Sequence, residues 1–207
     1  MVKLLTTESN RVIVQESVPE VILDTYQDDE EIMACAAHTD VDVKAYINAD
    51  KADTHLISLK NDISWADRIL IGPGIGTGET AVQLVRAVSE IDDKPIVFDA
   101  DALNIIAADD TIRKTITENS NDHITITPHM GELSRLLGGT AVEDIKKDWI
   151  SNVRHLSDEL GVTVISKDAR TLIISPYSDE CYLNVRGDSG LATAGSGGVL
   201  AGIAAAL

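Results

Sequence analysis

The stretch PIVFDADALN, residues 95–104, joins a short apolar run to a polar turn and the start of a helical pattern. An apolar run bounded by turn residues is typical of a buried strand, and the pattern that follows favours a helix. The same succession recurs along the chain, as in βαβ units that build a parallel sheet. The sequence therefore predicts an α/β fold with an open, mostly parallel sheet flanked by helices.

Apolar runs of strand length and helical patterns alternate over most of the chain. The predicted strands are Val2–Thr6, Arg68–Ile71, Pro95–Asp99, His123–Thr127, Val162–Ser166, Thr171–Ser175 and Cys181–Asn184. Helices are predicted near 78–90, 102–107, 130–137, 143–160 and 191–206. Ligands bind at the carboxyl ends of the strands in open α/β sheets, where polar or Gly-rich turns occur at 72–76, 99–104 and 127–132. These turns predict a ligand site on one rim of the sheet.

The run LATAGSGGVLAG, residues 191–202, is a Gly-rich turn that leads into an apolar helix. Unpaired backbone N–H groups and the helix dipole attract an anion at such a position, and glycine allows close approach. The spacing matches neither a P-loop nor a dinucleotide fingerprint. The turn therefore indicates a phosphate site, with a tight glycine-lined helix packing site as the alternative.

Composition narrows the classes of partner. The chain has 207 residues, is 44% hydrophobic and carries a formal charge of −17, which argues against nucleic acid and anionic membrane partners. Its two cysteines, Cys35 and Cys181, fit free thiols in a reducing cytosol and suggest no metal site. With no signal-peptide pattern and no long apolar run, we expect a cytoplasmic protein.

Five motifs occur in a fixed order: IGPGIG at 71–76, FDADALN at 98–104, TPHMGE at 127–132, SKDART at 166–171 and GLATAGSG at 190–197. Together they resemble the ADP/ATP-dependent NAD(P)H-hydrate dehydratase family of the ribokinase-like superfamily. The resemblance implies a single ribokinase-like domain over 1–207, with the charged segment 27–62 as an insertion or surface excursion. Members of that family have further elements at both ends, so we expect this chain to be a fragment of a longer domain.

The resemblance also implies a repair reaction. A phosphoryl group from ADP or ATP, with Mg²⁺, activates the hydroxyl of NADH or NADPH hydrate, and elimination of phosphate regenerates the reduced cofactor. Hydroxide leaves poorly whereas a phosphate ester leaves readily, so a kinase-like scaffold suits lyase chemistry. The expected partners are the hydrate and an adenine nucleotide, and a homo-oligomer is expected.

Carried over to this sequence, the family's substrate contacts fall on residues of several motifs. They are Gly74, Gly76, Asp99, Asn104, His129 and Gly198. Close backbone approach is the expected reason for glycine at the first two, and the His129 imidazole is expected to donate to the substrate. Asp101 has an alternative interpretation as a helix N-cap, and Glu132 is expected to cap the helix that starts at Met130.

The nucleotide contacts implied by the resemblance lie in two segments. They are Lys167, Asp168, Ala169, Arg170 and Thr171, together with Ala194, Gly195, Ser196 and Gly197. Two positions depart from the family: Asp168 replaces a glycine, and Gly198 replaces the aspartate that serves as general base. Losing a positioned base costs about 10²–10⁴-fold in rate. A catalytically impaired nucleotide-binding protein therefore stays open beside the dehydratase, as does a small-molecule kinase.

Overall fold

The computed structural model describes residues 1–26, 61–120, 122–186, 190 and 193–207. They form two compact units, Met1–Ala66 with Gly78–Ala81, and Asp67–Thr77 with Val82–Leu207. Most of the predicted insertion at 27–62 lies outside the described residues, so this expectation stays a prediction. Helices within the described part of the chain are all too short or too polar to cross a membrane.

The first unit contains a βαβ arrangement. Strand β1 (Lys3–Thr7) leads through the 3₁₀ turn η1 (Glu8–Asn10) and helix α1 (Arg11–Ser17) to the parallel strand β2 (Ile22–Tyr26). Lys3 pairs with Asp24 at 3.3 Å and also with Asp62. Only β1 was predicted from the sequence, because α1 and β2 are short and hold few buried side chains.

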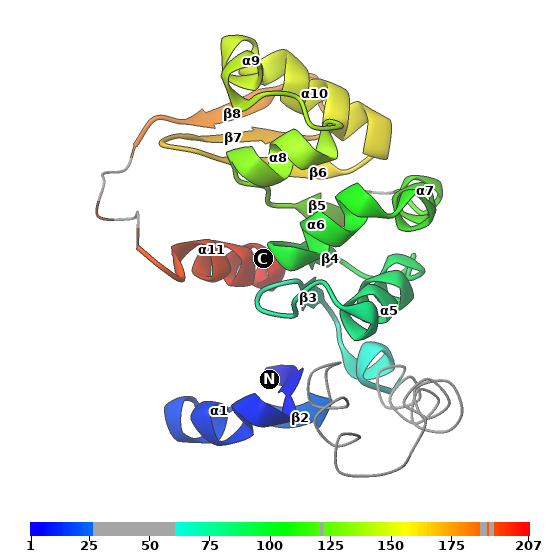
Figure 1. Cartoon of the computed structure of the whole chain (residues 1–207), viewed down its shortest axis with the longest axis vertical. Coiled ribbons are helices and arrows are strands. Elements are labelled where there is room, and N and C mark those ends of the chain that lie inside the picture. Colours follow the sequence, from blue (N-terminus) through cyan, green and yellow to red (C-terminus); the bar gives the residue numbers. More distant parts are fainter. Residues whose placement is uncertain (27–60, 121, 187–189, 191–192) are drawn as a thin grey trace. The chain divides into compact units, whose positions relative to one another are not determined.

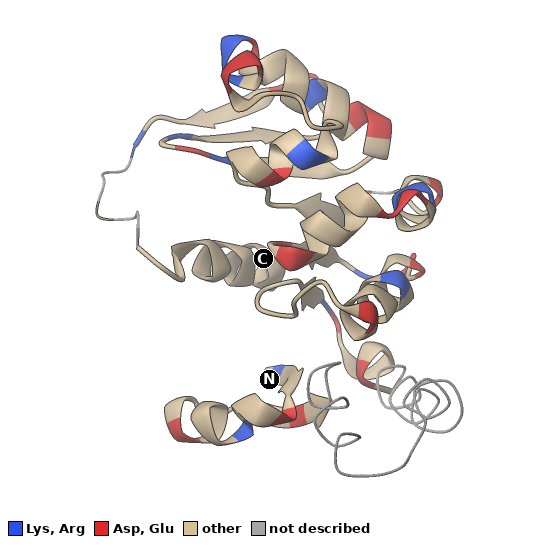
Figure 2. Ribbon diagram, in the orientation of Figure 1, with Lys and Arg blue, Asp and Glu red and all other residues tan. Residues whose placement is uncertain are grey.

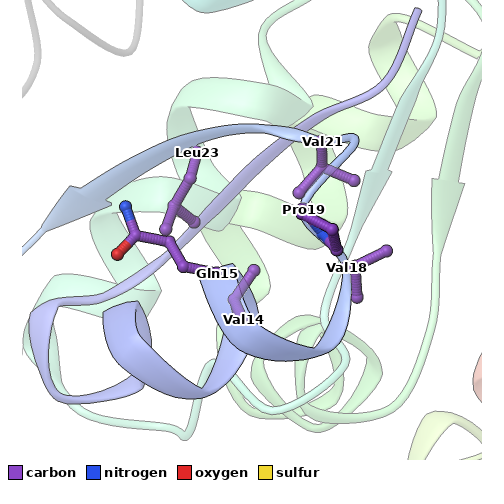
Figure 3. A pocket seen from close by; sticks show the side chains of 6 residues that line it. All are labelled: Val14, Gln15, Val18, Pro19, Val21 and Leu23. Carbon is purple, nitrogen blue, oxygen red and sulfur yellow. The ribbon is translucent and has the colours of Figure 1, made fainter.

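A hollow of about 320 Å³ lies between α1 and β2 in this unit. Figure 3 shows its lining, which is mostly apolar: Val14, Gln15, Val18, Pro19, Val21 and Leu23. None of the expected site residues belongs to it, so it is separate from the motifs that carry the predicted chemistry.

The second unit is built on a six-stranded sheet in the order β3-β4-β5-β6-β7-β8 (Figure 1). The strands are β3 (Ile69–Ile71), β4 (Ile96–Phe98), β5 (Ile124–Ile126), β6 (Thr163–Lys167), β7 (Thr171–Ile174) and β8 (Cys181–Asn184). The first four are parallel, and β7 and β8 are added antiparallel. The predicted α/β class, the mostly parallel sheet and these six strands are confirmed.

Helices connect the strands and cover the sheet. They are α5 (Glu79–Ser89), α6 (Asp101–Ala108), α7 (Asp110–Glu118), α8 (Met130–Leu136), α9 (Val142–Lys147), α10 (Trp149–Leu160) and α11 (Ser196–Ala206). The single helix predicted over 143–160 is wrong, because Asp148 takes a non-helical conformation with φ −139° and divides it. Helix α7 was not predicted, although Asp109 caps it by accepting from two backbone N–H groups.

The core lies where the apolar strands meet these helices. Strand β4 is buried throughout, and Phe98 has no exposed surface. Helix α6 contributes Leu103 and Ile106, while α7 contributes Ile112 and Ile116, one helical turn apart. The carboxyl ends of β4, β5 and β6 are thereby held on a rigid support.

Among the described glycines, Gly72 has the least room for a side chain. Its φ is +128°, and a Cβ at this position would lie 1.7 Å from the carbonyl oxygen of Asp99. Gly72→Ala is therefore expected to destabilise the fold by about 3 kcal/mol or more, through strain and steric overlap. Urea denaturation should show this loss.

Gly74→Ala is the matched control for this substitution. Gly74 also has a positive φ, +71°, but a Cβ there meets nothing within 4 Å. Its expected cost is about 1–2 kcal/mol, the left-handed penalty alone. Equal midpoints for the two variants would contradict the argument.

Candidate active site

Asp99 is the centre of the polar rim. It follows β4 directly, is only 2% exposed and accepts two short hydrogen bonds at Oδ1. Thr127 Oγ1 donates at 2.6 Å and Lys167 Nζ at 2.7 Å. Asp99 and Thr127 were expected on neighbouring turns, and the structure brings both together with Lys167, which is 68 residues from Asp99 in sequence.

The backbone explains why these side chains meet. Asp99 N donates to Ile71 O, Thr127 N to Phe98 O, and Lys167 N to Pro128 O. Parallel pairing therefore continues just beyond the strands. Side chains that follow successive parallel strands are placed at the same edge of the sheet, and this geometry assembles the rim.

The first turn of α11 lies beside Lys167. Gly195 is the N-cap, with φ +90°, and Val199 N donates back to Gly195 O. The N–H groups of Gly197 and Gly198 donate to no described residue. A Cβ on Gly197 would lie 3.5 Å from Lys167 Nζ, so the ammonium faces this turn. Within the described part of the chain, the turn combines N–H donors that have no acceptor, a helix dipole and a nearby cation, and these features favour phosphate binding.

Helix α11 brings no charge of its own. Its sequence SGGVLAGIAAA lacks charged residues, as Figure 2 shows, and it packs against β3 and β4. Figure 1 shows α11 alongside β3 at the end of the chain. The attraction for an anion at its first turn therefore rests on backbone N–H groups and on Lys167.

Gly74 and Gly76 lie in the loop between β3 and α5. Both have φ +71°, and a Cβ at either would meet nothing within 4 Å. The left-handed backbone by itself favours glycine at both positions. Close approach of a substrate to this backbone stays a prediction. Gly76 N donates to Asp101 Oδ2 at 3.0 Å.

This contact also corrects the alternative interpretation of Asp101. Helix α6 begins at Asp101, and its N-cap is Ala100, which has φ +51° and makes no side-chain cap. Asp101 is therefore not the N-cap. Its carboxylate ties the glycine loop to the first turn of α6 instead.

His129 caps helix α8. Its Nδ1 accepts from Gly131 N at 2.9 Å and from Glu132 N at 3.3 Å, while Glu132 Oε2 accepts from His129 N at 2.8 Å. The capping role expected for Glu132 is confirmed as a reciprocal capping box. His129 Nε2 lies 3.2 Å from Glu132 Oε1, so donation to a substrate requires this contact to be exchanged.

Burial raises the pKa of the Glu132 carboxyl above its ordinary value of 4.5, against the lowering effects of the His129 N–H and of the nearby His129 and Lys167 charges. A raised pKa means that the folded state favours the protonated carboxyl. Glu132 therefore supports folding fully below pH 4.5, and this contribution is lost as the pH rises through the raised pKa.

Glu132→Gln removes this titration while keeping an acceptor for His129 N. Relative to the wild type, the free energy of unfolding of the variant should therefore increase as the pH rises above 4.5 and through the raised pKa. Urea denaturation across this range measures the difference. Parallel stability curves would contradict the expectation.

Other expected residues make contacts that do not include the Asp99 carboxylate. Asn104 Oδ1 accepts from Arg135 Nη1 at 2.9 Å. Asp168, Ala169 and Arg170 form the exposed turn between β6 and β7, where Asp168 pairs with Lys146 at 2.8 Å. The negative charge of Asp168 is therefore partly offset by a local cation.

Comparison with known families bears directly on this geometry. A sequence model described as NAD(P)H-hydrate dehydratase matches residues 1–207. The chain belongs to this family. An ADP-dependent (S)-NAD(P)H-hydrate dehydratase of Neisseria meningitidis serogroup B is 42% identical over 163 residues, which cover 78% of this chain and 52% of that protein. The chain thus spans about half the length of this relative.

Solved structures show a similar fold. A ribokinase-like superfamily protein from Enterococcus faecalis V583 has a TM-score of 0.71 and 25% identity, covering 98% of this chain and 59% of that one. An ADP/ATP-dependent NAD(P)H-hydrate dehydratase from Bacillus subtilis, co-crystallized with ATP/Mg²⁺, has a TM-score of 0.63 and 23% identity, with 98% and 60% coverage. The fold is ribokinase-like, as the motifs predicted.

In this member of the NAD(P)H-hydrate dehydratase family, the structure brings Asp99, Lys167 and the first turn of α11 together. Two residues that shape this site were not predicted as site residues from the sequence. Thr127 was noted only as part of its motif, and Gly72 only as part of its loop. Their signal was position, because Thr127 ends a predicted strand and Gly72 directly follows one.

Proposed function

We propose that this protein dehydrates NADH or NADPH hydrate, using ADP or ATP as phosphoryl donor. The observation that carries the proposal is the Asp99–Lys167 pair beside first-turn N–H groups of α11 that donate to no described residue, in a chain of this family. The name of the Neisseria relative supports the reaction. NADH and NADPH hydrates remain equal candidates.

The chemistry follows from the leaving group. The hydrate oxygen attacks the terminal phosphorus of the nucleotide and passes its proton to water, while the bond to the bridging oxygen breaks and AMP or ADP leaves. Inorganic phosphate then leaves with the electrons of the C–O bond as a neighbouring ring carbon passes a proton to water, which forms the C=C bond of the reduced nicotinamide. Lys167 and the N–H groups of Gly197 and Gly198 would stabilise the charge on the transferring phosphoryl group.

Substrate contacts are proposed at Gly74, Gly76, Asp99, Asn104, His129 and Gly198. Nucleotide contacts are proposed at Lys167, Asp168, Ala169, Arg170, Thr171, Ala194, Gly195, Ser196 and Gly197. Geometry supports Lys167 and Gly197 most directly, since a Cβ on Gly197 would lie 3.5 Å from Lys167 Nζ. We also propose a single ribokinase-like domain over 1–207 that belongs to a longer one.

Mg²⁺ is proposed to arrive with the nucleotide. The described residues hold no group of three or more His, Cys, Asp or Glu side chains placed to bind a metal. Mg²⁺ commonly keeps several waters and binds through substrate phosphates, which fits this shortage of ligands. The cation would neutralise phosphate charge.

The setting proposed for this reaction is the cytoplasm, where nicotinamide cofactors are used. The net charge of −17 supports partners other than nucleic acid or anionic membranes. A homo-oligomer is proposed because α11 exposes Val199 and Ile203 by 64% and 54%.

The test is recovery of NADH absorbance from NADH hydrate in the presence of ADP or ATP. Recovery that depends on both protein and nucleotide supports the proposal. A stable phosphorylated product without recovery would favour a small-molecule kinase. Neither product at high protein concentration would contradict an active enzyme.

A second candidate rests on Gly198, which places no carboxylate at the first turn of α11. A protein that binds nucleotide without turning over hydrate would fit this residue. Calorimetry with AMP, ADP and NADPH separates the candidates, because binding without catalysis supports the second.

A further inference from the structure

Thr127 forms a buried unit with Asp99 and Lys167. Thr127 Oγ1 and Lys167 Nζ donate to the same oxygen, Asp99 Oδ1, at 2.6 and 2.7 Å. Thr127 is 0% exposed and Asp99 2%, so water has little access to compete for these bonds. We call Thr127, Asp99 and Lys167 the lysine clamp.

Rigid backbone holds the lysine clamp on three successive parallel strands. Asp99 follows β4, Thr127 follows β5 and Lys167 ends β6. Their backbones are bonded across the sheet, with Thr127 N on Phe98 O at 3.1 Å and Lys167 N on Pro128 O at 2.8 Å. Thr127 is thus fixed in place to orient the Asp99 carboxylate.

The clamp directs a cation to the candidate phosphate site. The Lys167 side chain is 18% exposed, and its ammonium lies 3.5 Å from where a Cβ on Gly197 would be. A lysine side chain has four rotatable bonds, so an unrestrained ammonium would spread over many positions. The hydrogen bond to Asp99 Oδ1 restrains the position of the Lys167 ammonium.

We propose that Thr127 is a positioning residue which, through Asp99, holds the Lys167 ammonium for a phosphate of the nucleotide. The hydroxyl has two effects. It fixes the rotamer of Asp99, and it shares the negative charge of Oδ1, so that less of the Lys167 charge is neutralised. The inference rests on the proposed function for the identity of the anion, a nucleoside diphosphate.

Thr127→Val keeps the shape of the side chain and removes the hydroxyl. Loss of a hydrogen bond to a charged group should weaken ADP binding about tenfold. Adenosine, which lacks phosphate, should not be affected. Calorimetry with ADP and adenosine measures both, and thermal unfolding confirms that the variant is folded.

Two control variants separate positioning from packing. Thr127→Ser keeps the hydroxyl and should restore ADP affinity. Thr125→Val makes the same change in β5 at a partly exposed position two residues earlier, and should leave ADP affinity unchanged. Loss of ADP affinity in all three variants would overturn the proposal.

A double-mutant cycle gives the decisive readout. In an Asp99→Asn/Lys167→Met background, which leaves no buried charge unpaired, Thr127→Val should have no further effect on ADP affinity. The inference would be overturned by an equal loss of ADP affinity in both backgrounds, by an equal loss of adenosine affinity, or by a wild type that does not bind ADP. If the cycle gives the expected result but the protein does not turn over hydrate, the inference is supported and only the proposed function is contradicted.

Discussion

Gly198→Asp is expected to raise the rate of hydrate dehydration by about 10²–10⁴-fold, the contribution of a positioned general base. Gly198 is the third residue of α11, and a Cβ there meets nothing within 4 Å. The first carbon of the new side chain therefore fits without displacing a described neighbour. The dipole of α11 favours its charged form, so it can accept the proton of the hydrate hydroxyl.

Gly202→Asp is the matched control for this gain. It makes the same substitution on the same helix, also where a Cβ meets nothing within 4 Å, but beyond the first turn. Turnover is followed as NADH recovery with ADP or ATP. Wild-type activity that Gly198→Asp fails to improve would assign the base to another group. Inactivity of both proteins with intact ligand binding would contradict the prediction that a carboxylate at position 198 supplies the base.

The strands of the larger sheet could be predicted because their signal is local. Strand β4 is a short run of buried apolar residues, and each of its neighbours also lies between turn residues. Helix α7 carries a weaker signal. Only Ile112 and Ile116 are buried in it, and the other residues are polar, so its stability depends on packing and on the Asp109 cap.

The candidate site was predictable as a set of turns but not as a set of contacts. The order of the motifs placed Asp99 and His129 on one rim, and the structure places them after neighbouring strands. The ion pair between Asp99 and Lys167 joins residues 68 apart, which no periodicity predicts. The steric restriction at Gly72 likewise comes from the carbonyl oxygen of Asp99, a residue that follows strand β4 and is distant in sequence.

Gly197→Val is expected to abolish nucleotide binding, with a loss of ADP affinity of about 10²-fold or more, or at least ~2.7 kcal/mol. Gly197 is the second residue of α11, and its Cβ would lie 3.5 Å from Lys167 Nζ. The two valine methyl groups would extend from that point into the space where a phosphate meets the ammonium. Several charge-assisted hydrogen bonds would be lost together.

The fold should tolerate this change, because Gly197 lies within α11 and its φ is outside the positive range that favours glycine. Gly197→Ala is the control, since a Cβ at 3.5 Å is in ordinary contact and should cost less affinity. Calorimetry with ADP and AMP, beside a thermal melt, distinguishes a blocked site from a damaged fold. Unchanged ADP affinity in folded Gly197→Val would place the nucleotide away from α11, because no phosphate bound to that turn could avoid the added methyl groups.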